Sequence, residues 1–197
     1  TMKENSPTLV AAEIPAFYFA AQDLEKIAGQ YRDEFKANPP FPHVVIDHFL
    51  PDEIIARLIK EFPGPDDIEW GIAGPGATKQ TRNKYIEKIW TSDETKFGPF
   101  TRHLLQQMNS GAFIRFIEQL TGEKGIIPDP TFNGCGLHST GPGGRLMLHI
   151  DTNRHALGPR FHQRYNLILF LNEDWREEYG GHLELWNKDA SQCVKKV

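Results

Sequence analysis

Apolar residues recur at helical spacing in the first half of the chain, in segments that end at proline, glycine or turn residues. Residues 23–38 keep this spacing until a Pro-Pro pair, which stops a helix. Residues 51–62 begin with Pro-Asp-Glu, a favourable first helical turn, and carry one apolar face. We expect a further helix over 100–108, and another from Ser110, a suitable N-cap, to Gly122, which suits a C-terminal end.

From Thr131 onward the pattern changes to short apolar runs separated by turn residues. Such runs predict strands, and their density without intervening helices indicates a sandwich or barrel. We expect strands at 132–140, 145–151, 164–171, 182–186 and 192–197, with Gly141-Pro142-Gly143-Gly144 as a turn between the first two, and an earlier strand at 43–49. The chain is therefore predicted to be an α+β protein, with helices first and a β core second.

One predicted strand carries a histidine and an aspartate two residues apart, His149 and Asp151. Alternate residues of a strand point to the same face, so the imidazole and the carboxylate would project together. They would supply two of the three ligands of a 2-His-1-carboxylate triad, the ligand set of non-haem Fe(II) oxygenases. An H-x-D pair by itself is a weak signal, because chance supplies it often.

The predicted strand 164–171 divides by parity into two faces. One face is apolar and suits the packed side: Tyr165, Leu167, Leu169 and Leu171. The other is mixed: Arg164, Asn166, Ile168 and Phe170. A mixed face is typical of the wall of a ligand pocket, and equally of solvated positions near a strand start. Parity leaves both interpretations open.

Composition limits the class of protein. The 197 residues are 39% hydrophobic with a net charge of −4, which suits one soluble domain with a sizeable core. The sequence has no dense Lys/Arg cluster, so nucleic acid is not expected as a partner. It also has no apolar run of the ~20 residues that a membrane span needs, so no membrane partner is expected. Two cysteines provide neither a disulfide framework nor a cysteine-based zinc site, which favours a reducing, cytoplasmic setting.

Several segments together resemble the 2-oxoglutarate and Fe(II)-dependent oxygenase superfamily. They are Gly134-Cys135-Gly136-Leu137-His138, Gly143-Gly144-Arg145-Leu146 and His149-Ile150-Asp151. The run from Arg164 to Trp175, followed by Gly180-Gly181-His182-Leu183-Glu184-Leu185-Trp186, is similar to the strand-loop-strand segment of the prolyl 4-hydroxylase-like branch. The resemblance covers residues 41–197, and residues 1–40 are expected to form an N-terminal helical extension.

The resemblance implies a double-stranded β-helix, a cupin-like jelly roll, with the N-terminal helices packed on one sheet. His149 and Asp151 would be catalytic and would bind Fe(II). The co-substrate 2-oxoglutarate would lie in a pocket lined by four further side chains: His138, Asn166, Phe170 and Leu183. The resemblance allows ascorbate as an additional cofactor.

The reaction implied is hydroxylation of an unactivated C–H bond by O₂, with release of succinate and CO₂. The branch favours a prolyl residue in a peptide or protein, or a proline-like amino acid. Related halogenases replace the carboxylate ligand with a small residue, so Asp151 favours hydroxylation. Residues 63–83 and 152–163 would form the substrate walls, where Arg154 and Arg160 could bind a carboxylate.

The sequence departs from the family pattern at its C-terminal end. The family's distal histidine, and the basic residue that pairs with oxoglutarate, lie on strands later than residues 192–197. We therefore expect the final strands to be missing and the natural chain to continue, and we expect the 197 residues alone to bind iron and oxoglutarate poorly. His155, His162 and His182 are poor substitutes for the third ligand.

Two other classes of function stay open on the sequence. The first is a non-catalytic jelly-roll module for binding or scaffolding that has lost a complete iron site. A zinc-dependent hydrolase is the second, although it needs a further ligand and a general base for which the sequence has no motif.

Overall fold

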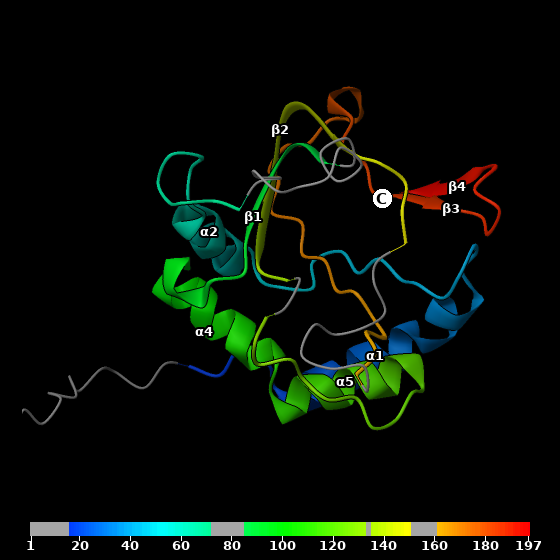
Figure 1. Ribbon diagram of the computed structural model, residues 1–197. Coiled ribbons are helices and arrows are strands. Elements are labelled where there is room, and N and C mark those ends of the chain that lie inside the picture. The colour runs from blue at the N-terminus through cyan, green and yellow to red at the C-terminus, as the bar shows by residue number, and fades with distance from the viewer. Residues whose placement is uncertain (1–15, 72–84, 133–134, 151–160) are drawn as a thin grey trace, which may run out of the picture.

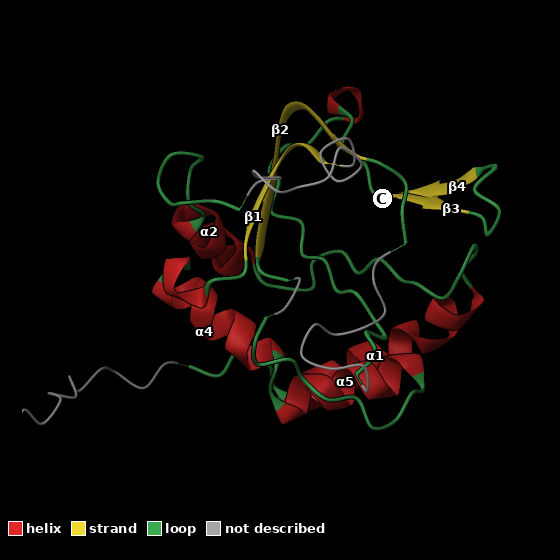
Figure 2. Ribbon diagram, viewed as in Figure 1, coloured by secondary structure: helices red, strands yellow, loops and turns green. Residues whose placement is uncertain are grey.

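The residues that the structure describes form four α-helices and two small antiparallel sheets, a mixed α/β arrangement (Figures 1 and 2). The computed structural model describes residues 16–71, 85–132, 135–150 and 161–197. In chain order the elements are α1 (Ala21–Ala37), α2 (Asp52–Glu61), β1 (Tyr85–Thr91), the 3₁₀ turn η1 (Glu94–Lys96), α4 (Pro99–Met108), α5 (Gly111–Thr121), β2 (Leu137–Leu146), the 3₁₀ turn η2 (Glu177–Tyr179), β3 (Glu184–Trp186) and β4 (Cys193–Lys196). Among these residues, no helix is both long enough and apolar enough to span a membrane.

The helices begin and end close to the predicted positions. The Ser110 hydroxyl accepts the N–H of Phe113 at 3.4 Å, which confirms Ser110 as the N-cap of α5. Gly122 ends the same helix with a left-handed φ of 82°, a conformation that glycine adopts without a steric cost. Helix α1 ends at Ala37, two residues before the first proline of the Pro-Pro pair.

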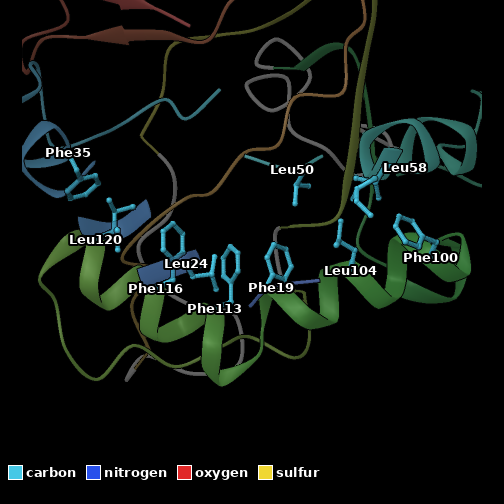
Figure 3. Packing of buried hydrophobic residues seen from close by; sticks show 12 residues of the cluster. Phe19, Leu24, Phe35, Leu50, Leu58, Phe100, Leu104, Phe113, Phe116 and Leu120 are labelled. Atoms are coloured by element: carbon cyan, nitrogen blue, oxygen red, sulfur yellow. The ribbon is translucent and has the colours of Figure 1, made fainter. Parts of the chain in front are cut away.

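The main hydrophobic core lies where α1 packs along α5 (Figure 1). Figure 3 shows Phe113 and Phe116 of α5 pointing into this layer beside Phe19, and the rings of Phe19 and Phe113 meet edge to face at 5.0 Å. The buried cluster comprises Phe19, Leu24, Ala28, Phe35, Leu50, Ile54, Leu58, Phe100, Leu104, Phe113, Phe116 and Leu120. Burial of each large side chain contributes roughly 1.5–3 kcal/mol, so the helices form the best-packed part of the fold.

A carboxylate fastens α2 to the start of α4. Glu61, the last residue of α2, accepts the backbone N–H groups of Phe100 at 3.2 Å and Thr101 at 2.8 Å. The Thr101 hydroxyl donates to the same carboxylate at 2.9 Å. Because the first N–H groups of a helix have no partner within it, Glu61 serves as the cap that α4 lacks locally.

Strands β1 and β2 pair antiparallel, with a bulge in the middle of β2. Lys88 pairs with Thr140 and Ile86 with Arg145, so residues 141–144 lie opposite Glu87 alone. The prediction of a turn at residues 141–144 is therefore wrong. Proline and glycine are tolerated here because bulged residues make no regular ladder contacts, and Gly143 has a φ of 75°.

Two of the predicted strands are wrong. Residues 43–46 and 163–172 are in neither helix nor strand. An alternating pattern records only which side chains are buried, whereas a strand also needs a neighbouring strand to complete its hydrogen bonds. The apolar side chains still pack as the alternation indicates, because Val44, Ile46 and Tyr165 contact the helical core.

Strands β3 and β4 form a short hairpin within the predicted segments 182–186 and 192–197. Glu184 pairs with Lys196, and Leu183 and Val197 extend the ladder with two hydrogen bonds of 3.0 and 2.9 Å. Within the described ranges, the β structure thus consists of two two-stranded sheets. These residues do not form the double-stranded β-helix that the family resemblance implies.

Candidate functional site

His149 lies three residues after β2 and is half-buried. Its Nδ1 atom lies 2.7 Å from the carbonyl oxygen of Met147. A carbonyl oxygen can only accept, so Nδ1 carries a proton, and in the neutral ring Nε2 is the unprotonated nitrogen. Metal-binding histidines typically donate their other ring N–H to a carbonyl or carboxylate in this way. The ring therefore has the tautomer that a metal ligand needs.

The partner of His149 in the predicted pair, Asp151, lies outside the described residues. The predicted strand over 145–151 is shorter than expected, because β2 ends at Leu146. The same-face argument for the pair is therefore not tested. Among the residues that the structure describes, no group of three or more His, Cys, Asp or Glu side chains could hold a metal ion.

His138 lies in β2, directly opposite Trp90 of β1. Its neighbour Leu137 is buried in a second small cluster with Trp70 and Phe97, and alternate residues of a strand face opposite sides. The His138 side chain is accordingly exposed. The structure places it on the outer face of the β1–β2 pair.

The segment 163–172 presents two different sides. Its partly buried residues that pack against the helical cluster are Tyr165, Leu169 and Leu171. Ile168 and Phe170 are 53% and 50% exposed, and Asn166 is also exposed. The predicted division by parity therefore holds for these residues, while Leu167, at 48% exposed, departs from it.

Polar and backbone contacts fix two of the predicted co-substrate residues. The Asn166 amide oxygen accepts a hydrogen bond from the Gln163 side chain. Leu183 is joined to Val197 through both its N–H and its carbonyl group, at the start of the β3–β4 hairpin. Its side chain is 36% exposed, so it stands partly open to solvent.

Glu123, just beyond α5, contacts the segment that carries Asn166 and Phe170, and no sequence motif points to this contact. Its carboxylate lies 2.7 Å from Nη2 of Arg164 and accepts the Tyr165 hydroxyl at 3.1 Å. The hydrogen bond from Arg164, followed by that from Tyr165, holds the pKa of Glu123 below its ordinary value. Arg164 and Tyr165 lie 41 and 42 residues after Glu123 in the sequence, so no local pattern could reveal these contacts.

A shallow hollow of about 420 Å³ lies next to this contact. It is lined by Phe35, Lys36, Pro42, Thr121, Arg164 and Tyr165. The predicted iron and oxoglutarate residues that the structure describes, His138, His149, Asn166, Phe170 and Leu183, do not line it. The hollow is therefore separate from the described part of the candidate site.

The two cysteines, Cys135 and Cys193, are unbonded. Although part of Cys135 reaches solvent, desolvation raises the pKa of its thiol to about 11, and the nearby Asp129 carboxylate adds to the effect. The thiol is therefore protonated at neutral pH, and the thiolate that binds metals is not its resting form.

Comparison with known proteins finds a family match in the C-terminal part of the chain. Residues 135–197, less than half of the chain, match the family model described as the 2OG-Fe(II) oxygenase superfamily. No curated protein and no solved structure matches the chain. The match supports a dioxygenase-type function, and the family implies Fe(II), 2-oxoglutarate and O₂. It gives no support to a non-catalytic binding module and does not specify a branch.

Proposed function

We propose that the protein is an Fe(II)- and 2-oxoglutarate-dependent dioxygenase that hydroxylates an unactivated C–H bond and releases succinate and CO₂. The observation that carries this proposal is the family match over residues 135–197, which contain every predicted iron and co-substrate residue. We further propose that residues 41–197 belong to an oxygenase domain of the jelly-roll type, preceded by the helical extension 1–40.

His149 and Asp151 are proposed as two of the iron ligands. The protonated Nδ1 of His149, bound to the Met147 carbonyl, supports this role because it leaves the Nε2 lone pair as the donor. A neutral imidazole and a carboxylate are also ligand types of the non-haem iron triad. When bound, the iron would activate O₂ with oxoglutarate as the electron source.

The remaining residues are proposed to position the co-substrate. Asn166 and Phe170 lie on the side of their segment that faces away from the helical core. A half-exposed aromatic ring and an exposed amide on the same side of one segment suit the mixed lining of a small-molecule site. We assign His138 and Leu183 to the same pocket on the family resemblance. Ascorbate is an optional reductant in this proposal.

We propose a prolyl residue or a proline-like amino acid as the substrate, on the resemblance of residues 164–186 to the prolyl 4-hydroxylase-like branch. Asp151, a ligand that halogenases lack, supports hydroxylation as the outcome. A cytoplasmic setting agrees with two unbonded cysteines.

The experiment is an oxoglutarate turnover screen of the full-length protein with Fe(II) and O₂. Proline-containing peptides and free proline are compared with matched peptides in which alanine replaces proline. We expect succinate formation coupled to a mass gain of one oxygen atom on the proline compounds alone. Oxidation of another class of compound, coupled to succinate formation, would overturn the proposed substrate. Absence of oxoglutarate turnover with every compound would overturn the proposed activity.

A further inference from the structure

One carboxylate holds two consecutive residues of the segment that carries Asn166 and Phe170. The Glu123 network, defined as Glu123, Arg164 and Tyr165, contains a 2.7 Å ion pair and a 3.1 Å hydrogen bond from the Tyr165 hydroxyl. The Tyr165 ring also meets Phe35 of α1 edge to face at 6.1 Å. The start of the segment is therefore anchored at once to α1 and to the end of α5.

The segment needs such an anchor because no regular sheet pairing determines which of its side chains face the helical core. Residues 163–172 are in neither helix nor strand. In an extended chain, a slip by one residue moves each side chain to the opposite face. With Tyr165 held toward the helices, Leu169 and Leu171 follow it into the core, while Ile168 and Phe170 stay half exposed.

The exposure of the ion pair indicates orientation rather than stability as its role. The Arg164 side chain is 57% exposed and that of Glu123 is 33% exposed. Ion pairs in contact with water contribute little to the free energy of unfolding. Two directional hydrogen bonds to neighbouring residues nevertheless restrict rotation of the segment about its own axis.

We propose that Glu123 is a positioning residue, whose contacts with Arg164 and Tyr165 turn Asn166 and Phe170 toward the oxoglutarate pocket. The second half of this inference rests on the proposed function. Glu123 lies outside the family match at 135–197, so the role would be specific to the way in which this chain's helices support the oxygenase segment.

Cysteine labelling tests the orientation without any need for activity. In a background of Cys135→Ser and Cys193→Ser, single cysteines replace Ile168 or Leu169, and their alkylation rates are compared. We expect faster labelling at 168 than at 169, and a ratio that falls toward one in Glu123→Ala. Glu25→Ala, which removes an exposed carboxylate on α1, should leave the ratio unchanged.

If Leu169→Cys does not fold, the pair Phe170→Cys and Leu171→Cys gives the same comparison. A ratio that is unaffected by Glu123→Ala overturns the inference. In the full-length protein, Glu123→Ala should raise the KM for oxoglutarate more than it lowers kcat. If Glu123→Ala changes the labelling ratio but leaves the KM for oxoglutarate unchanged, the link to the pocket is overturned. If Glu123→Ala brings the labelling ratio toward one, but the protein never turns over oxoglutarate, only the proposed function is refuted.

Discussion

The Nδ1 atom of His149 lies 2.7 Å from the carbonyl oxygen of Met147, two residues earlier in the chain. The contact is local, because both residues belong to the same short segment after β2. It also sets the tautomer that presents Nε2 as the electron-pair donor. Metal-binding histidines typically make such a contact through the ring nitrogen that does not bind the metal.

Opposite faces of the segment 163–172 should differ in their contribution to stability. Leu169→Ala should lower the free energy of unfolding by about 1–2 kcal/mol, because its side chain packs against the helical core. Phe170→Ala should cost under about 1 kcal/mol, because its ring is half exposed already. Urea denaturation of both variants measures the difference, and a larger loss at Phe170 would contradict the assigned faces.

Removal of the Glu61 carboxylate should destabilise the junction of α2 and α4. Glu61→Ala leaves the N–H groups of Phe100 and Thr101 without their acceptor, at a cost of about 1–2 kcal/mol. Glu25→Ala, at an exposed position of α1, serves as the control and should change stability by less than about 0.5 kcal/mol. Equal denaturation midpoints for the two variants would show that Glu61 is not a cap.

Two glycines of the β2 region should respond differently to alanine. At Gly136, φ is +115° and a Cβ would lie 2.2 Å from the Thr91 carbonyl oxygen. At Gly143, φ is +75° and the space around a Cβ is open to 4 Å. Gly143→Ala should therefore cost only the left-handed strain of about 1–2 kcal/mol, and Gly136→Ala distinctly more. Thermal unfolding ranks the two, and the reverse order would contradict the β1–β2 register.

The Glu123 network should make a small, pH-dependent contribution to stability in the acidic range, because its ion pair is in contact with water. The folded pKa of Glu123 lies below its ordinary value of 4.5, through the hydrogen bonds from Arg164 and Tyr165. Its contribution is therefore complete above about pH 4.5 and is lost as the pH falls through the folded pKa. The difference in unfolding temperature between the native protein and Glu123→Gln should shrink on acidification. A difference that grows at low pH would contradict this sign.

The sequence predicts the helices better than the sheets, for a physical reason. A helix satisfies its own backbone within one segment, so local signals such as Ser110 and Gly122 locate its ends. A strand depends on a partner elsewhere, and β1, although rich in aromatic and β-branched residues, was not predicted. The pattern over 163–172 indicates the packed side for Tyr165, Leu169 and Leu171 but not for Leu167, and it cannot show whether a neighbouring strand is present.

The candidate site also has a part that the sequence predicts and a part that it does not. The family resemblance predicts His149, Asn166 and Phe170 as site residues, and all three lie within the matched range. The structure adds the Nδ1 contact of His149 and the exposure of Asn166 and Phe170. Glu123 could not be predicted, because its partners are brought to it only by the packing of the chain.

The most direct test of the central claim is oxoglutarate-dependent succinate formation by the full-length protein and its His149→Ala and Asp151→Ala variants. His48→Asn is a matched control, because His48 is an exposed histidine with a φ of 54° that asparagine also tolerates. The proposed iron site predicts loss of succinate formation in both ligand variants and native turnover in the control. Unchanged turnover in His149→Ala or Asp151→Ala would contradict the assignment.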